Sequence, residues 1–125
     1  MIRTFKDIQN KTLVINTRRH AIILSRPIEE NGKMHFPDET FEDLIIFLQD
    51  ESQKCWDNFN PKEANSFSSD YYEYYDKQFD NNGYISIDEH SLNIERPVEG
   101  KERCYQFNKA KMQSFMFDLL NGVGD

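Results

Sequence analysis

The sequence predicts an α+β fold, a single compact domain over residues 1–125 in which an antiparallel sheet packs against two to three helices. The first observation is the length, because 125 residues suit one domain and allow a sizeable buried core. The second is that short apolar runs bounded by turn residues alternate with segments of helical apolar period. The third is their order of strands, helices, strands and a helix, which is typical of this class.

Two short apolar runs near the N-terminus, Thr12–Ile15 and Ala21–Leu24, are predicted to be strands. The segment Glu30–Lys33 contains an Asn-Gly pair, which is typical of a tight hairpin turn. This turn is expected to fold Met34–Phe36 back onto the preceding strand.

A helix is expected to begin at Pro37 with Asp38 as its cap and to end near residues 58–61. Glu39 and Glu42 would then lie near the positive end of the helix dipole. The prediction depends on apolar residues that recur with a period of 3.6, namely Phe41, Leu44, Ile45, Leu48, Cys55, Trp56 and Phe59.

A polar break at Asn65–Ser69 is followed by the tyrosine-rich segment Asp70–Phe79. This segment is predicted to be a short helix capped by Ser68 or Ser69. Asp80–Gly83 is expected to form the turn after it.

The C-terminal third is predicted to contain three strands and a helix. A hairpin is predicted from two strands, Tyr84–Asp88 and Leu92–Ile94, joined through residues 89–91. A turn is expected at Pro97–Lys101, followed by a further strand at Cys104–Phe107. The final helix is expected to have Asn108 as its cap, Gly122 as its stop, and core residues Met112, Phe115, Met116 and Leu119.

Composition excludes several classes of protein. A net charge of −7 disfavours general binding of nucleic acid or anionic membranes, because phosphate groups need a basic surface. The apolar runs Ala21–Leu24 and Leu44–Leu48 are far shorter than a membrane helix, and residues 1–7 lack the apolar stretch of a signal peptide. The expected location is therefore cytoplasmic. In a reducing cytosol Cys55 and Cys104, which have no CxxC spacing, are expected to be buried thiols rather than a disulfide.

The charge is unevenly distributed along the chain. Residues 1–27 carry six basic side chains and one acid, whereas residues 28–95 carry 17 acids and four lysines. Residues 96–125 hold five basic and four acidic side chains. A binding partner would therefore meet the acidic middle. The alternative is that the basic front end and the acidic middle neutralise each other within the fold.

Aromatic residues concentrate in the same acidic middle, since nine of the 17 lie between Trp56 and Tyr84. A helix with tyrosines at positions 71, 72, 74 and 75 cannot bury all of them on one face, so some are expected to be exposed among carboxylates. Tyrosines and acids together are typical of a surface that binds a basic protein. The alternative is that these rings fill the core. The predicted partner-binding residues are Glu39, Glu42, Asp43, Asp70, Tyr71, Tyr72, Glu73, Tyr74, Tyr75 and Asp76.

The segment Gln78–Glu89 resembles the calcium loop of EF-hand proteins. Asp80 would take the third position, Asn82 the fifth and Glu89 the bidentate twelfth. The first position, an aspartate in that family, is Gln78 here, which removes one anionic ligand. The resemblance implies a calcium-binding module with candidate ligands Asp80, Asn82 and Glu89. The other interpretation is a turn followed by a strand.

The protein is not expected to be an enzyme and no cofactor is expected, since the sequence contains no GxSxG, P-loop, HExxH or GxGxxG motif. His90 beside Asp88 is the remaining acid–base or metal candidate, with a solvated turn as the alternative. Cys55 lies on the apolar helix stripe, where a thiol behaves as a small hydrophobe.

In size, acidity, aromatic content and lack of catalytic groups, the chain resembles bacterial immunity proteins against contact-delivered toxins, the contact-dependent inhibition type. The resemblance implies a small non-catalytic inhibitor that binds a basic protein, such as a nuclease toxin, by covering its active site. It implies no direct contact with nucleic acid or membrane. Phage proteins that inhibit host defence nuclease complexes have the same profile and are the alternative.

Overall fold

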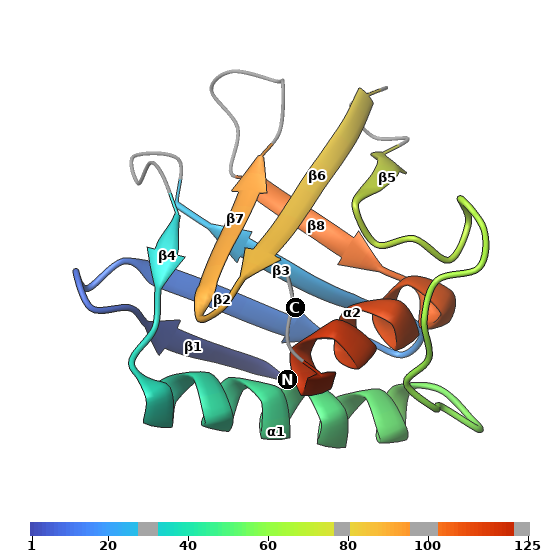
Figure 1. Cartoon of the computed structure of the whole chain (residues 1–125), viewed down its shortest axis with the longest axis horizontal. Coiled ribbons are helices and arrows are strands. Elements are labelled where there is room, and N and C mark those ends of the chain that lie inside the picture. Colours follow the sequence, from blue (N-terminus) through green and yellow to red (C-terminus); the bar gives the residue numbers. More distant parts are fainter. Residues whose placement is uncertain (28–32, 77–80, 96–102, 122–125) are drawn as a thin grey trace.

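The strands form two antiparallel sheets of four strands each (Figure 1). The computed structural model describes residues 1–27, 33–76, 81–95 and 103–121. The first sheet has the order β1 (Ile2–Lys6), β2 (Thr12–Thr17), β3 (Ile22–Arg26) and β8 (Arg103–Phe107). The second has the order β4 (Met34–His35), β7 (Ser91–Glu95), β6 (Asn81–Asp88) and β5 (Glu73–Asp76). The helices are α1 (Asp38–Cys55) and α2 (Lys109–Asn121).

The two sheets are layered, and the strands of the second cross those of the first at a steep angle (Figure 1). Strand β8 contacts β5, β6 and β7 of the second sheet and also packs against α2, so it lies at the junction of the layers. Helix α1 contacts β1 and α2. The fold is therefore α+β, as the sequence predicts, with its strands divided between two sheets.

The core forms between these layers because β2, β3, β6, β7 and β8 alternate buried apolar residues with exposed or half-buried ones. The alternating buried pairs are Leu13 and Ile15, Ile22 and Leu24, Tyr105 and Phe107, Ile85 and Ile87, and Leu92 and Ile94. The helices add Phe41, Leu44, Phe47 and Leu48 from α1 and Met112, Phe115, Met116 and Leu119 from α2.

The buried carboxylate of Asp7 joins the two sheets at one corner. Its Oδ1 accepts hydrogen bonds from the backbone N–H groups of Gln9 and Lys11, at 2.9 and 2.7 Å. Its Oδ2 accepts from the N–H of His35 at 3.1 Å, and the N–H of Ile8 donates to the His35 carbonyl at 2.8 Å. One acid thus closes the β1–β2 turn and fixes β4 beside it, because its charge-assisted bonds satisfy three donors at once.

Several element predictions are confirmed. Thr12–Ile15 lies within β2, Ile22–Leu24 lies within β3, which begins one residue after Ala21, and residues 104–107 lie within β8. The hairpin of β6 and β7 turns through residues 89–90. Asn108 caps α2, since its Oδ1 accepts from the N–H of Lys111 at 2.9 Å.

The predicted helix at Asp70–Phe79 is wrong, because residues Glu73–Asp76 form strand β5 along β6. Four tyrosines in five positions favour a strand more than a helix, since aromatic rings suit a pleated, half-buried surface. The last residues of the predicted helix, 77–79, lie outside the described residues.

The expected pairing of Met34–Phe36 with the preceding strand is also wrong. Strand β4 pairs with β7, with Met34 opposite Leu92, because the free edge of β3 is occupied by β8. Residues 30–32 of the predicted hairpin turn lie outside the described residues. The turn predicted for residues 97–101 lies wholly outside them.

Helix α1 differs from its prediction at both ends. Pro37 is the N-cap residue and makes no side-chain cap bond, while Asp38 is the first helical residue. The helix ends at Cys55, before the predicted residues 58–61, and Asn58 has a left-handed φ of 58°. In the described part of the chain, no helix is both long and apolar enough to cross a membrane.

Candidate functional site

An acidic cleft of about 540 Å³ lies between β6, α2 and the segment that precedes β5. Its charged lining residues are Glu63, Asp70 and Asp118, and all three are acids. Tyr71 and Tyr72 form its aromatic wall, and Ile85 and Ile87 of β6 belong to its apolar lining. We call this site the acidic cleft. Glu63 and Asp118 are not among the residues predicted from sequence, because they lie outside the tyrosine-rich segment and only the fold brings them to it.

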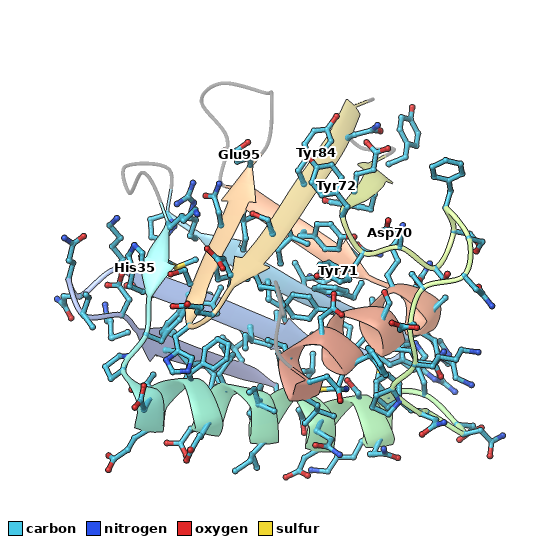
Figure 2. The ribbon with its side chains drawn as sticks, in the orientation of Figure 1. His35, Asp70, Tyr71, Tyr72, Tyr84 and Glu95 are labelled. Atoms are coloured by element: carbon cyan, nitrogen blue, oxygen red, sulfur yellow. The ribbon has the colours of Figure 1, made fainter. Side chains whose placement is uncertain are left out.

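A smaller groove of about 110 Å³ adjoins the acidic cleft and shares Tyr72, Ile85 and Ser86 with it. Its outer wall is Tyr84, whose ring meets that of Tyr72 edge-on with centroids 5.8 Å apart (Figure 2). Glu95 adds a fourth carboxylate. The two hollows therefore form a continuous face over β6, rimmed by acids and by paired aromatic rings.

The predicted tyrosines divide between this face and the core. Tyr72 and Tyr75 are 58% and 56% exposed, as expected for binding residues. Tyr74 is half-buried, and its ring packs on that of Tyr105 with centroids 4.7 Å apart. Tyr71 is half-buried and packs edge-on against Phe115 at 5.1 Å. Some of the four rings are thus exposed and others pack on the core, and for Tyr74 and Tyr75 this follows from the alternation of side chains along β5.

Buried hydrogen bonds hold the inner wall of the acidic cleft in place. The Tyr71 hydroxyl donates to Asp118 Oδ2 at 2.6 Å, and the Tyr105 hydroxyl donates to the Tyr71 carbonyl. Burial, followed by the hydrogen bond and charge of Asp118, raises the pKa of Tyr71 well above its ordinary 10.0. Burial, followed by the charge of Asp70, raises the pKa of Tyr105 likewise.

Lys111 fixes the same wall from the side of α2. Its Nζ donates to the carbonyls of Asp70 and Glu73, at 2.9 and 2.8 Å. Burial lowers the pKa of Lys111, against the opposing effect of the Asp70 and Glu73 carboxylates. This lysine therefore anchors backbone and leaves the carboxylates of Asp70 and Glu73 to face outward.

We predict that alkaline conditions destabilise the protein through Tyr105. Below pH 10 its hydroxyl is protonated in both states, so its contribution to stability is complete. Above pH 10 the unfolded chain ionises while the folded chain does not, so stability falls, by at most about 1.4 kcal/mol per pH unit for one such group. Urea unfolding of wild type and Tyr105→Phe at pH 8, 10 and 11 measures this. Tyr105→Phe is expected to be less stable than wild type at pH 8 but to lose less stability between pH 8 and pH 11. Because Lys111, whose effect on stability has the opposite sign, is present in both proteins, the comparison isolates the contribution of Tyr105. If wild type and Tyr105→Phe lose the same stability between pH 8 and pH 11, the alkaline effect does not come from Tyr105.

Phe67 is 97% exposed at the tip of a loop that borders the acidic cleft. The buried Ser69 orders this loop, since its Oγ accepts from the N–H groups of Asn65 and Ser66 at 3.0 and 3.1 Å. The loop is tied to α2, because the Ser114 hydroxyl donates to the Ser69 carbonyl at 2.5 Å. Phe67 is thus presented on an ordered support. In the sequence, the feature that marks Phe67 is that a single aromatic residue lies within the polar break Asn65–Ser69.

The other predicted acids, Glu39, Glu42 and Asp43, are exposed on the first turns of α1. This end of α1 lies beneath β4, at the opposite side of the molecule from β5 (Figure 1). The acids predicted to share one surface therefore form two separate groups. The backbone of Asp76 ends β5, and the side chain of Asp76 falls outside the described part.

The carboxylates that line the acidic cleft form no ion pair with another described residue. Lys54 forms an ion pair with Glu51 at 3.3 Å, and His90 Nδ1 lies 2.9 Å from Asp38 Oδ1. In the basic front end, Arg3 packs its guanidinium over the rings of Phe5 and Phe47. The acids that line the cleft thus remain available to a partner.

The EF-hand interpretation is wrong for the described residues of its segment. Residues 81–88 form the extended strand β6, and Glu89 lies in the turn after it with a φ of 52°. At about 3.3 Å per residue, Asn82 and Glu89 are separated by about 20 Å, whereas calcium ligands lie about 2.4 Å from one ion. Asp80, the remaining candidate, lies outside the described residues.

The histidines hold the β4 end of the second sheet together. His90 pairs with Asp38 rather than with Asp88, and its ring packs on that of Phe41 with centroids 4.9 Å apart. His35 Nδ1 and the Ser91 hydroxyl are 2.6 Å apart across β4 and β7. Within the described ranges, no three histidine, cysteine or acidic residues cluster so as to hold a metal ion. Neither Cys55 nor Cys104 is in a disulfide bond, and burial raises the pKa of Cys55.

No family model, no curated protein and no solved structure matches this chain.

Proposed function

We propose that this protein is a non-catalytic inhibitor that binds a basic protein through the face formed by the acidic cleft, Phe67, Tyr72 and Tyr75. The observation that carries the proposal is that an acidic hollow is walled by the 58% exposed Tyr72, beside the loop that carries the exposed Phe67. A nuclease toxin is the partner that this chemistry fits best, because an enzyme that binds nucleic acid has a basic active-site surface.

The carboxylates supply attraction and selectivity. Glu63, Asp70 and Asp118 line one hollow, and no basic side chain is among the described residues that line it with them. Carboxylates placed in this way accelerate encounter with a cationic partner and reject acidic ones. Their effect is expected mainly in the association rate and its dependence on salt.

The aromatic side chains supply affinity. Exposed tyrosine and phenylalanine rings give large contact areas with few rotatable bonds, and such residues dominate the energetics of interfaces. Tyr72 is already held against Tyr84, and the Phe67 loop is held by Ser69, so little conformational entropy is lost on binding.

The test begins with affinity capture from the native host and purification of the captured protein. We then expect Glu63→Gln with Asp70→Asn to weaken binding by about tenfold to a hundredfold, mostly through the association rate, as removal of two steering charges does. Asp70→Asn retains the side-chain oxygen that accepts from the N–H of Tyr72 at 2.9 Å. Surface plasmon resonance at two salt concentrations measures both rates.

The two separated acidic groups provide a matched control. Glu39→Gln with Glu42→Gln removes the same number of charges from α1, at the opposite side of the molecule. This variant is expected to change the affinity less than about twofold. If it weakens binding as much as the cleft variant, or if the cleft variant binds as tightly as wild type, the proposed face is wrong. Failure to capture any basic protein contradicts the proposed function itself.

A further inference from the structure

The structure also contains a cationic pocket at the end of the molecule where the β2–β3 turn, the end of α1 and the start of α2 meet (Figure 1). It has a volume of about 360 Å³ and is lined by Arg19, His20, Lys54, Cys55, Trp56, Asp57 and Lys109. Three cations and one carboxylate give this lining an excess of positive charge in a chain whose net charge is −7. We call it the cationic pocket.

Side chains at the end of α1 build this pocket by fixing the β2–β3 turn. The thiol of Cys55 donates to the carbonyls of Arg18 and Arg19, at 3.3 and 3.6 Å. The indole N–H of Trp56 donates to the carbonyl of His20 at 3.3 Å. Three successive carbonyls are thus held from one side, and the turn is closed by the N–H of Arg18, which donates to Ala21. The cations of the turn are therefore carried on an ordered backbone.

Two of the three cations that line this pocket, Arg19 and Lys109, form no ion pair with another described residue, whereas Lys54 pairs with Glu51. Within the described residues, neither Arg18 nor Arg19 forms an ion pair, and both side chains are exposed. Lys54 Nζ contacts Glu51 at 3.3 Å, and Lys109 Nζ donates to the carbonyl of Asp57 at 2.6 Å. The Lys109 ammonium is thus held in place by a neutral acceptor and keeps donors free, since each ammonium has three.

We propose that the cationic pocket binds the phosphate group of a small phosphorylated molecule. A phosphate monoester carries nearly two negative charges and three acceptor oxygens, which suit a pocket lined by one guanidinium and two ammonium groups. The volume lies within the range of small-ligand sites, and the pocket is concave, which favours a small molecule over a protein surface. The site is separate from the acidic cleft and does not depend on the proposed function.

The test is an NMR titration of the whole chain with inorganic phosphate, ribose 5-phosphate and neutral ribose. Both phosphates are expected to shift the amide signals of residues 18–20, 54–57 and 109, with dissociation constants on the order of 1 mM, as weak charge-assisted contacts give. Tighter binding of ribose 5-phosphate assigns the ligand class to phosphate esters, whereas equal binding assigns the pocket to the free ion. Neutral ribose is expected to leave these signals unchanged.

Arg19→Gln with Lys54→Gln is expected to weaken phosphate binding by at least about tenfold, because it removes two of three cations. Lys6→Gln with Lys62→Gln is the matched control, since both lysines are exposed and lie outside the pocket and the net charge changes equally. No shifts at about 10 mM phosphate, which is well above the expected dissociation constant, overturn the proposal. The proposal is also overturned if the control variant weakens phosphate binding equally, or if neutral ribose alone shifts the same amide signals.

Discussion

Replacement of Phe67 by alanine is expected to weaken binding of the basic partner by about a hundredfold, the effect of losing one aromatic anchor at an interface. The ring is 97% exposed, so it contributes almost no buried area to the fold. The loop around it is ordered by the hydroxyl of Ser69, which the substitution does not touch. The melting temperature of Phe67→Ala is therefore expected to stay within about 1 °C of wild type, as for other surface substitutions. Isothermal titration calorimetry and thermal unfolding measure the two effects.

Ile8→Ala is the matched control for this experiment, since Ile8 is 64% exposed in the β1–β2 turn, away from the acidic cleft. It removes an exposed apolar side chain and is expected to leave the affinity unchanged. Phe67→Leu is expected to retain part of the affinity, because it keeps apolar area but loses the ring. If Phe67→Ala binds as tightly as wild type, the anchor is elsewhere on the face. If its melting temperature falls by several degrees, the side chain is structural.

The local patterns of the sequence predicted most of the elements. Short apolar runs bounded by turn residues located β2, β3, β7 and β8, and period-3.6 apolar residues located both helices. Strand β1 was missed because Ile2–Lys6 has only Phe5 buried, so its pattern resembles a polar terminus. Partner choice was also missed, because β4 pairs with β7 across more than 50 residues and no local signal encodes that pairing.

The candidate site was predicted in chemistry but not in geometry. Asp70, Tyr71 and Tyr72 do line one hollow, yet the residues after them form a strand, in which Tyr74 is half-buried and Tyr75 is exposed. Asp118 joins them only because α2 packs beside this segment, through the hydroxyl of Tyr71. The count of charges along the chain also grouped the acids of α1 with these residues. Such a count does not tell on which side of the folded molecule α1 begins.

The interpretation of residues 80–83 as a turn placed Gly83 in a loop, but Gly83 lies within β6, opposite Tyr74 of β5. A Cβ at this position would lie 2.4 Å from Tyr74 Cε1 and 3.2 Å from the Cys104 carbonyl oxygen. The glycine is therefore required by the close approach of an aromatic ring and of β8. This contact connects the binding face to the core, because Tyr74 packs on Tyr105.

Gly83→Ala is accordingly expected to destabilise the protein by about 2 to 3 kcal/mol, the upper range for added atoms in a packed site. The Tyr74 ring cannot simply move aside, since Tyr105 is fully buried behind it. Its displacement would shift β5, and with it Tyr75, so binding of the partner is expected to weaken too. Urea unfolding at pH 7 measures the stability, and Ser86→Ala, at an exposed position of the same strand, is expected to change it by less than about 0.5 kcal/mol.

A double-mutant cycle with Tyr74→Ser identifies the cause of the destabilisation. Tyr74→Ser alone loses the ring contact with Tyr105 and is expected to destabilise the protein by itself. When it is combined with Gly83→Ala, the added methyl group meets no ring, so the second substitution is expected to add less than about 1 kcal/mol. The Cys104 carbonyl oxygen, which would lie 3.2 Å from the added methyl group, accounts for that remainder. Simple additivity of the two losses would show that the glycine is needed for the backbone of β6 rather than for the ring of Tyr74. The face that carries Tyr72 and Tyr75 would then not depend on this contact for its shape.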